Sequence, residues 1–206
     1  MTHTHHMVDY MKELYVLWKP VFPYLAMHIE ELYGRKGGTI LDVGPFVGVS
    51  RTLVERTIGN AFLIATFPRG MGRFLKQEIV HDTGDIPYVF FETDPSLDCM
   101  RDHSVDLVIF RGAFFFPEVF VPDIQALHRV LKPDGVGIVG GGFGKYTPPS
   151  LIQEIGERSR DLNKLIGKVN ISRISIEATI ISHNMERFCE IISDGGLWVI
   201  IRKQKS

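Results

Sequence analysis

The stretch from Gly38 to Ser50 constrains the fold of this chain more than any other. It begins as an apolar run, reaches an acid at Asp42, passes Gly44 and Gly48, and leads into residues 51–56, whose apolar positions recur at helical spacing. A strand, a tight glycine-bearing loop and a helix in this order open an α/β unit. Such a loop lets backbone approach a ligand, and the helix N-terminus offers free N–H groups. A tight turn without a ligand is the alternative.

Composition limits the classes of protein that need to be considered. The 206 residues are enough for one α/β domain and too few for two, and 45% hydrophobic with 23% charged residues is typical of a globular protein. The sequence shows no signal peptide and no bilayer-spanning apolar run, and its net charge of −1 gives no general attraction to nucleic acid. We expect a cytoplasmic protein that binds neither nucleic acid nor a membrane. A homodimer is left open.

The N-terminal segment is expected to be helical. Residues 8–33 predict two helices separated by Pro20 and Pro23, because proline interrupts a helix. Residues 1–6 are rich in histidine and could chelate a metal, but a terminal segment of this kind is more often unstructured. Cys99 and Cys189 lack the C-x-x-C spacing of a metal site. We therefore assign no metal site.

After the first helix, apolar runs alternate with helical patterns. Strands are expected at 61–67, 88–91, 104–110 and 136–139, and helices near 73–78, 121–131, 149–166 and 170–184. Asp194-Gly195 between two β-rich runs predicts a terminal hairpin. The sequence therefore predicts a Rossmann-like three-layer α/β/α sandwich, whose mostly parallel seven-stranded sheet ends in an antiparallel β-hairpin. We expect one domain, with residues 1–37 as a helical cap and 38–206 as the core.

Three segments resemble the class I S-adenosylmethionine-dependent methyltransferases. Asp42-x-Gly44-x-Phe46-x-Gly48 is similar to the family's motif I, acid-x-Gly-x-Gly-x-Gly. Residues 104–111 look like its fourth strand, and residues 126–135 (Ala-Leu-His-Arg-Val-Leu-Lys-Pro-Asp-Gly) look like its helix-to-strand corner. The resemblance covers residues 38–202. It implies S-adenosylmethionine as cofactor and methyl transfer to an acceptor, which we expect to be a small molecule because no extra domain could hold a macromolecule.

The resemblance also implies the residues of the site. On the cofactor side, at the tips of the first four strands, these are Asp42, Gly44, Pro45, Phe46, Gly48, Thr66, Asp94, Arg111 and Gly112. On the substrate side they are Trp18, Phe114, Phe115, Gly142 and Phe143. The acids could instead cap helices or turns, and the phenylalanines could be core. Methyl transfer mainly needs positioning and desolvation, so no catalytic residue is assigned. The histidines that could supply a base are His28, His128 and His183.

Two features depart from the family pattern. Phe46 replaces the middle glycine, and the tip of the second strand, Thr66-Phe67-Pro68-Arg69, lacks the acid that binds ribose in nucleoside-binding folds. Both support an alternative: a non-catalytic methyltransferase-like fold that binds another ligand or a protein partner. A third hypothesis is an oxidoreductase using a phosphorylated nicotinamide nucleotide, with Arg69 on its 2′-phosphate. The absent Gly-x-Gly-x-x-Gly fingerprint counts against it.

Overall fold

The computed structural model of the chain describes residues 2–80 and 86–204, and its centre is one seven-stranded sheet. The strands are β1 (Thr39–Val43), β2 (Ala61–Thr66), β3 (Tyr88–Glu92), β4 (Val105–Arg111), β5 (Leu131–Gly141), β6 (Cys189–Ile192) and β7 (Leu197–Arg202). The helices are α1 (Thr2–Trp18), the short 3-10 helix η1 (Lys19–Val21), α2 (Phe22–Tyr33), α3 (Ser50–Glu55), α4 (Met71–Val80), α5 (Ile124–Val130), α6 (Pro149–Leu165) and α7 (Arg173–Ser182).

The strand order is β3-β2-β1-β4-β5-β7-β6. The first five strands run parallel, and β7 lies antiparallel between β5 and β6. β1 pairs with β2 on one side and with β4 on the other, so the strand order reverses between β1 and β4. In open α/β sheets this reversal opens a crevice at the carboxyl ends of the strands, where ligands bind.

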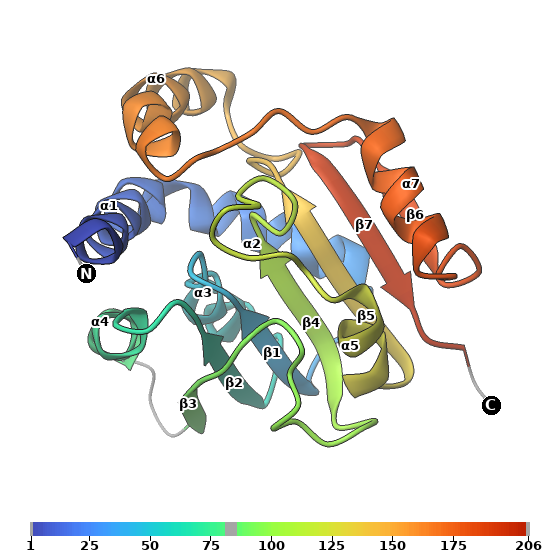
Figure 1. Cartoon of the computed structure of the whole chain (residues 1–206). Coiled ribbons are helices and arrows are strands. Elements are labelled where there is room, and N and C mark those ends of the chain that lie inside the picture. The colour runs from blue at the N-terminus through green and yellow to red at the C-terminus, as the bar shows by residue number, and fades with distance from the viewer. Residues whose placement is uncertain (1, 81–85, 205–206) are drawn as a thin grey trace.

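Helices cover both faces of the sheet, which confirms the predicted three-layer sandwich and its terminal hairpin. Figure 1 shows α2 and α3 behind the sheet and α5 in front of it, with α7 beside the β6–β7 end. The helices α1 and α6 lie side by side beyond the carboxyl ends of the strands (Figure 1). This pair forms a roof over the edge at which a ligand is expected.

The N-terminal helices agree with the prediction in their break but not in their start. The break falls at Lys19–Val21, and Pro23 is tolerated in the first turn of α2 because the first N–H groups of a helix have no intrahelical acceptor. The expectation that residues 1–6 are unstructured is wrong for the described part, since α1 begins at Thr2. Among the described residues, no helix is both long and apolar enough to cross a membrane.

Two element boundaries differ from the prediction around the corner at residues 126–135. Helix α5 begins later than expected because the side chain of Asp123 accepts a hydrogen bond from the Ala126 N–H (2.8 Å) and caps the helix there. Strand β5 begins earlier, at Leu131, and pairs with Val105 before a register shift. The turn within it is made by Asp134, whose φ of +62° is a left-handed conformation.

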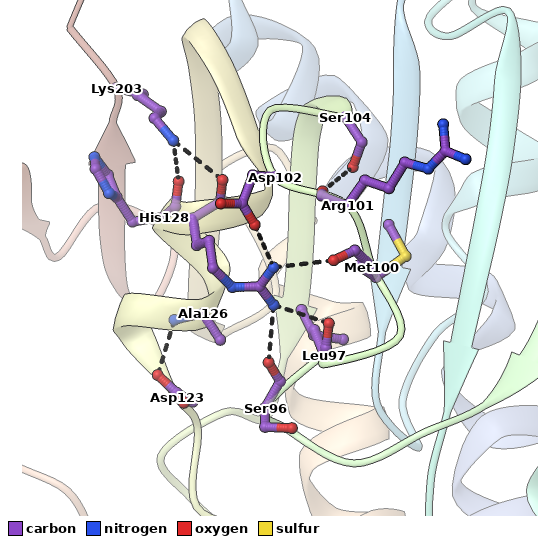
Figure 2. A network of polar contacts seen from close by, with 11 residues as sticks. Ser96, Leu97, Met100, Arg101, Asp102, Ser104, Asp123, Ala126, His128 and Lys203 are labelled. Atoms are coloured by element: carbon purple, nitrogen blue, oxygen red, sulfur yellow. Dashed lines mark hydrogen bonds and ion pairs between the residues drawn. The ribbon is translucent and has the colours of Figure 1, made fainter.

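Arg129, the arginine of this corner, binds the loop between β3 and β4. Its guanidinium donates hydrogen bonds to the carbonyl oxygens of Ser96 (3.3 Å), Leu97 (2.9 Å) and Met100 (2.9 Å), and to the carboxylate of Asp102 (2.7 Å). Figure 2 shows these partners gathered from the loop that follows β3. One side chain of α5 thus fastens the β3–β4 connection to the front of the sheet.

Candidate functional site

A cavity of about 220 Å³ lies under the roof of α1 and α6, at the carboxyl ends of β1, β4 and β5. Its walls come from α1 and the start of α2, from the loops after these three strands, and from α6 with the turn that follows it. The predicted residues that line it are Trp18, Phe46, Arg111, Gly112, Phe115, Gly142 and Phe143. The structure therefore brings together seven residues that the sequence assigned to the cofactor and substrate sides.

Further residues complete the lining of the cavity. They are Leu14, Tyr15, Phe22, Val47, Phe116, Gly141, Gly156, Ser159, Asn163 and Lys168. Gly156, Ser159 and Asn163 recur at spacings of three and four along α6, so they form a stripe of small and polar side chains on one helical face. That stripe is visible in the sequence and could have marked α6 as a wall of the site. The prediction of this helix rests on its apolar positions alone.

Arg111 is the principal charge in the cavity wall. It is 7% exposed, its Nη1 donates to the carbonyl oxygen of Phe46 (3.1 Å), and its guanidinium lies 5.1 Å and 5.2 Å from the ring centres of Trp18 and Phe22. Burial lowers the pKa of Arg111 to about 10, so it remains charged at neutral pH. Within the described residues it makes this one hydrogen bond and no ion pair, although a guanidinium has five N–H donors.

Asp42 is fully buried at the end of β1. Its Oδ2 accepts a hydrogen bond from the Gly48 N–H (3.0 Å), while its Oδ1 has no hydrogen-bond partner. Burial raises the pKa of Asp42 to about 7, against the smaller opposing effects of Gly48 and Arg111. The carboxyl group is therefore poised between its two protonation states at neutral pH. Its unpartnered Oδ1 is buried, and Asp42 does not line the cavity.

The glycines of this loop make room for aromatic rings of the chain itself. A Cβ at Gly48 (φ +137°) would come within 2.5 Å of the Tyr15 ring, and one at Gly44 (φ +99°) within 2.9 Å of the Phe110 ring. Phe46, which stands where the family pattern has glycine, packs on Phe116 with ring centres 4.7 Å apart. Its ring also fits against Gly112, where a Cβ would lie 2.6 Å away. The bulk of Phe46 is thus accommodated by a glycine on the neighbouring strand end.

The tip of β2 lies outside this cavity. Thr66 is buried and donates a long hydrogen bond to the Phe91 carbonyl (3.4 Å). Phe67 is 6% exposed and packs edge-on against Phe110 and Phe120, with ring centres 5.7 Å and 5.4 Å away. The β2 tip therefore offers an apolar cluster where the family pattern has an acid.

Asp94 occupies a turn at the surface and does not line the cavity. Its Oδ1 accepts hydrogen bonds from the Ser96 N–H (2.9 Å) and hydroxyl (2.5 Å), and these bonds hold its pKa below the usual range. This arrangement is the turn-capping alternative considered for this acid. Its predicted role on the cofactor side stays a prediction.

A different carboxylate lies beside the β2 tip. Glu92, the last residue of β3, is paired in register with Thr66. Its Oε1 accepts a hydrogen bond from the Gly70 N–H (3.3 Å) in the turn that follows β2. No sequence pattern singles out Glu92, because only strand pairing places it next to a residue 26 positions earlier.

The remaining candidates lie elsewhere. Phe114 is buried and faces a separate hollow of about 150 Å³ between the β4–α5 connection and α7, so its assignment to the substrate side of this cavity is not supported by its position. Pro45 is buried and does not line the cavity. The three histidines also lie outside it: His28 packs on Trp198, His128 packs on Phe188, and His183 bonds the Thr179 carbonyl. Among the described residues, no group of three or more His, Cys, Asp or Glu side chains is placed to hold a metal ion.

Comparison with known proteins identifies the fold. No family model and no curated protein matches the chain. Among solved structures, a proposed S-adenosyl-L-methionine-dependent methyltransferase of Methanococcus maripaludis superposes with a TM-score of 0.75 at 24% identity, covering 97% of this chain and 93% of that one. A methyltransferase of Thermotoga maritima gives 0.53 at 15% identity (98% and 100%), and a proposed sarcosine dimethylglycine methyltransferase of Galdieria sulphuraria gives 0.53 at 17% (95% and 98%). The chain has the fold of S-adenosylmethionine-dependent methyltransferases, as the sequence predicted.

Proposed function

We propose that this chain is an S-adenosylmethionine-dependent methyltransferase that acts on a small-molecule acceptor held in the cavity under α1 and α6. The observation that carries the proposal is the position of that cavity. It lies at the carboxyl ends of β1 and β4, where the strand order reverses, and buried Arg111 lines it. Two of the structural neighbours named above, those of Methanococcus maripaludis and Thermotoga maritima, are described as S-adenosylmethionine-dependent, which makes it the cofactor to expect on this fold.

The residues at the end of β1 fit the amino acid portion of this cofactor. The buried Oδ1 of Asp42 has no partner inside the protein and would accept a hydrogen bond from an ammonium group. When bound, S-adenosylmethionine supplies a methyl group on a sulfonium sulfur, which an oxygen, nitrogen, sulfur or carbon nucleophile of the acceptor displaces.

The chain itself contributes positioning and the exclusion of water. Trp18 stacks on Phe143 with ring centres 4.5 Å apart, and Phe46 packs on Phe116, so aromatic pairs form much of the cavity wall. An aromatic cavity of this kind positions the acceptor for in-line attack and shields its nucleophile from water.

Glu92 is the residue that we assign to the ribose hydroxyls. The β2 tip has no acid, but the Glu92 carboxylate lies against the turn after β2 through its bond to Gly70. A carboxylate at the end of β3 would bind the ribose hydroxyls as one at the tip of β2 would, because both strand ends border the same edge of the sheet.

One observation favours the second candidate, a methyltransferase-like fold without methyl transfer. Phe67, Phe110 and Phe120 pack together at the ends of β2 and β4, where an adenosine group would be expected to approach. If these rings stay in place, the chain would bind a smaller ligand in the cavity and no adenosyl compound.

Calorimetric titration separates the two candidates. We expect the wild-type protein to bind S-adenosylmethionine and S-adenosylhomocysteine in the micromolar range and NADPH not at all. Asp42→Ala should abolish binding of both adenosyl ligands, and Glu92→Gln should weaken it about tenfold, as for a lost charge-assisted hydrogen bond. Glu190→Gln, an exposed glutamate on β6, is the matched control and should bind like wild type. A folded wild-type protein that binds neither adenosyl ligand would refute the methyltransferase proposal.

A further inference from the structure

We propose that the cavity recognises a small organic anion, a carboxylate carried on an apolar or aromatic body, through Arg111 and Lys168. The inference rests on the proposed function only in taking this anion to be the methyl acceptor. The binding of the anion itself follows from the residues of the cavity alone.

Arg111 supplies the inner charge. It is nine-tenths buried, lies over the rings of Trp18 and Phe22, and makes a single hydrogen bond, to a carbonyl oxygen. A buried cation is costly unless an anion and hydrogen bonds compensate it. Asp42 interacts with Arg111 electrostatically but forms no ion pair with it. A large fraction of the Asp42 carboxyl groups is protonated at neutral pH. The guanidinium is thus charged, desolvated and short of acceptors, as expected of a side chain that binds a carboxylate.

Lys168 supplies a second positive charge at the mouth of the cavity. It follows α6, is exposed, and its Nζ lies 5.7 Å from the centre of the Phe115 ring. The Lys168 backbone N–H donates to the Asn163 carbonyl (2.9 Å) and the next residue, Val169, bonds to the Phe115 carbonyl (2.9 Å), so this turn is fastened to the cavity wall. Partial desolvation lowers the pKa of the Lys168 amine, which fits a cation over an apolar opening.

The rest of the wall has no competing charge. Arg111 and Lys168 are charged, and none of the described residues that line the cavity is an aspartate or glutamate. Ser159 and Asn163, joined by a hydrogen bond of 3.2 Å, add a polar patch on α6. A cavity with two cations and no acids selects an anion over a neutral or cationic ligand.

Aromatic and small residues define the body of the ligand. The pairs Trp18–Phe143 and Phe46–Phe116 give flat walls, and Gly156 on α6 has open space where a Cβ would be. Glycine within a helix lowers stability. A glycine at this position, where it leaves space in the cavity wall, therefore fits a cavity that has to accommodate a ligand. A cavity of about 150 Å³ is enough to bind benzene, so one of about 220 Å³ holds a benzoate-sized ligand.

A carboxylate at Arg111 could also come from the methionine portion of the cofactor. The two sources are distinguished by measuring both ligands on the same variants. Titrations use benzoate and its neutral counterpart benzamide, each with and without saturating S-adenosylhomocysteine, and S-adenosylhomocysteine alone. The variants are Arg111→Met, Lys168→Met, Gly156→Leu and the control Lys164→Met, an exposed lysine of α6 outside the cavity. Melting curves verify folding, and Lys168→Met keeps the test valid should Arg111→Met fail to fold.

We expect wild type to bind benzoate at least tenfold more tightly than benzamide. Lys168→Met and Arg111→Met should each weaken benzoate at least tenfold, Gly156→Leu should abolish its binding by filling the cavity, and Lys164→Met should change nothing. Equal binding of the two probes, or no benzoate binding, overturns the inference. Loss of S-adenosylhomocysteine binding in Arg111→Met with benzoate affinity unchanged overturns it too, because Arg111 then serves the cofactor. Benzoate binding without any adenosyl ligand binding supports the anion site and refutes the proposed function alone.

Discussion

Replacing Asp42 by asparagine tests the central electrostatic feature of the site. The carboxyl group is fully buried, with one hydrogen bond from the Gly48 N–H and one unpartnered oxygen. Asparagine has the same shape and keeps an oxygen that accepts the Gly48 bond, but it does not titrate. The variant therefore removes one ionisable group from the core and leaves the packing in place.

The expected effect follows from the raised pKa. Burial raises the pKa of Asp42 from 3.8 to about 7, so the folded protein holds a proton that the unfolded chain releases. Protonated Asp42 makes its full contribution to stability below the pKa of the unfolded state. That contribution is lost as the pH rises through the pKa of the folded state. The loss amounts to about 1.4 kcal/mol per pH unit between those values. From pH 5 to pH 7 the free energy of unfolding of the wild type should fall by about 2 kcal/mol relative to that of Asp42→Asn. Above pH 8 the free energies of the two proteins should change in parallel.

Urea unfolding of both proteins at pH 5, 6, 7 and 8 measures this difference, and comparing them cancels the titration of every other group. The slopes of free energy against urea concentration should agree between the proteins, which would show that both unfold from similarly compact states. A stability difference that stays constant from pH 5 to pH 8 would show that Asp42 is already ionised in the folded protein. The account of its burial would then be wrong.

Three further substitutions test the packing around the site. Gly156→Ala should raise the free energy of unfolding by about 0.5–1 kcal/mol in urea titrations, because its Cβ meets nothing within 4 Å and alanine favours the helix; a loss of stability would contradict the open wall. Gly48→Ala should cost at least about 2 kcal/mol, from a φ of +137° and a Cβ 2.5 Å from Tyr15, and a thermal melt like that of wild type would refute that contact. Arg129→Met should cost about 1–3 kcal/mol and speed amide hydrogen exchange in residues 96–102; unchanged exchange would mean that Arg129 does not fasten this loop.

Local patterns in the sequence determined the fold. Alternating apolar runs and helical spacings gave the order of strands and helices, and Asp194-Gly195 gave the terminal hairpin, because these signals depend on neighbours along the chain. The same is true of the loop after β1, whose acid and glycines stand where the strand ends. Arg111, at the end of β4, could likewise be placed at the carboxyl edge before its contacts were known.

Only the tertiary structure decided what these residues face. The glycines at 44 and 48 face the rings of Phe110 and Tyr15, and the carboxylate beside the β2 tip is Glu92 from β3. Lys168 joins Arg111 in one cavity because α6 crosses the strand ends next to α1. Such contacts join residues far apart in the chain, and they depend on strand order and helix packing, which local patterns do not encode. The sequence therefore determined which elements form and where their tips lie, while the folded structure decided which side chains meet there.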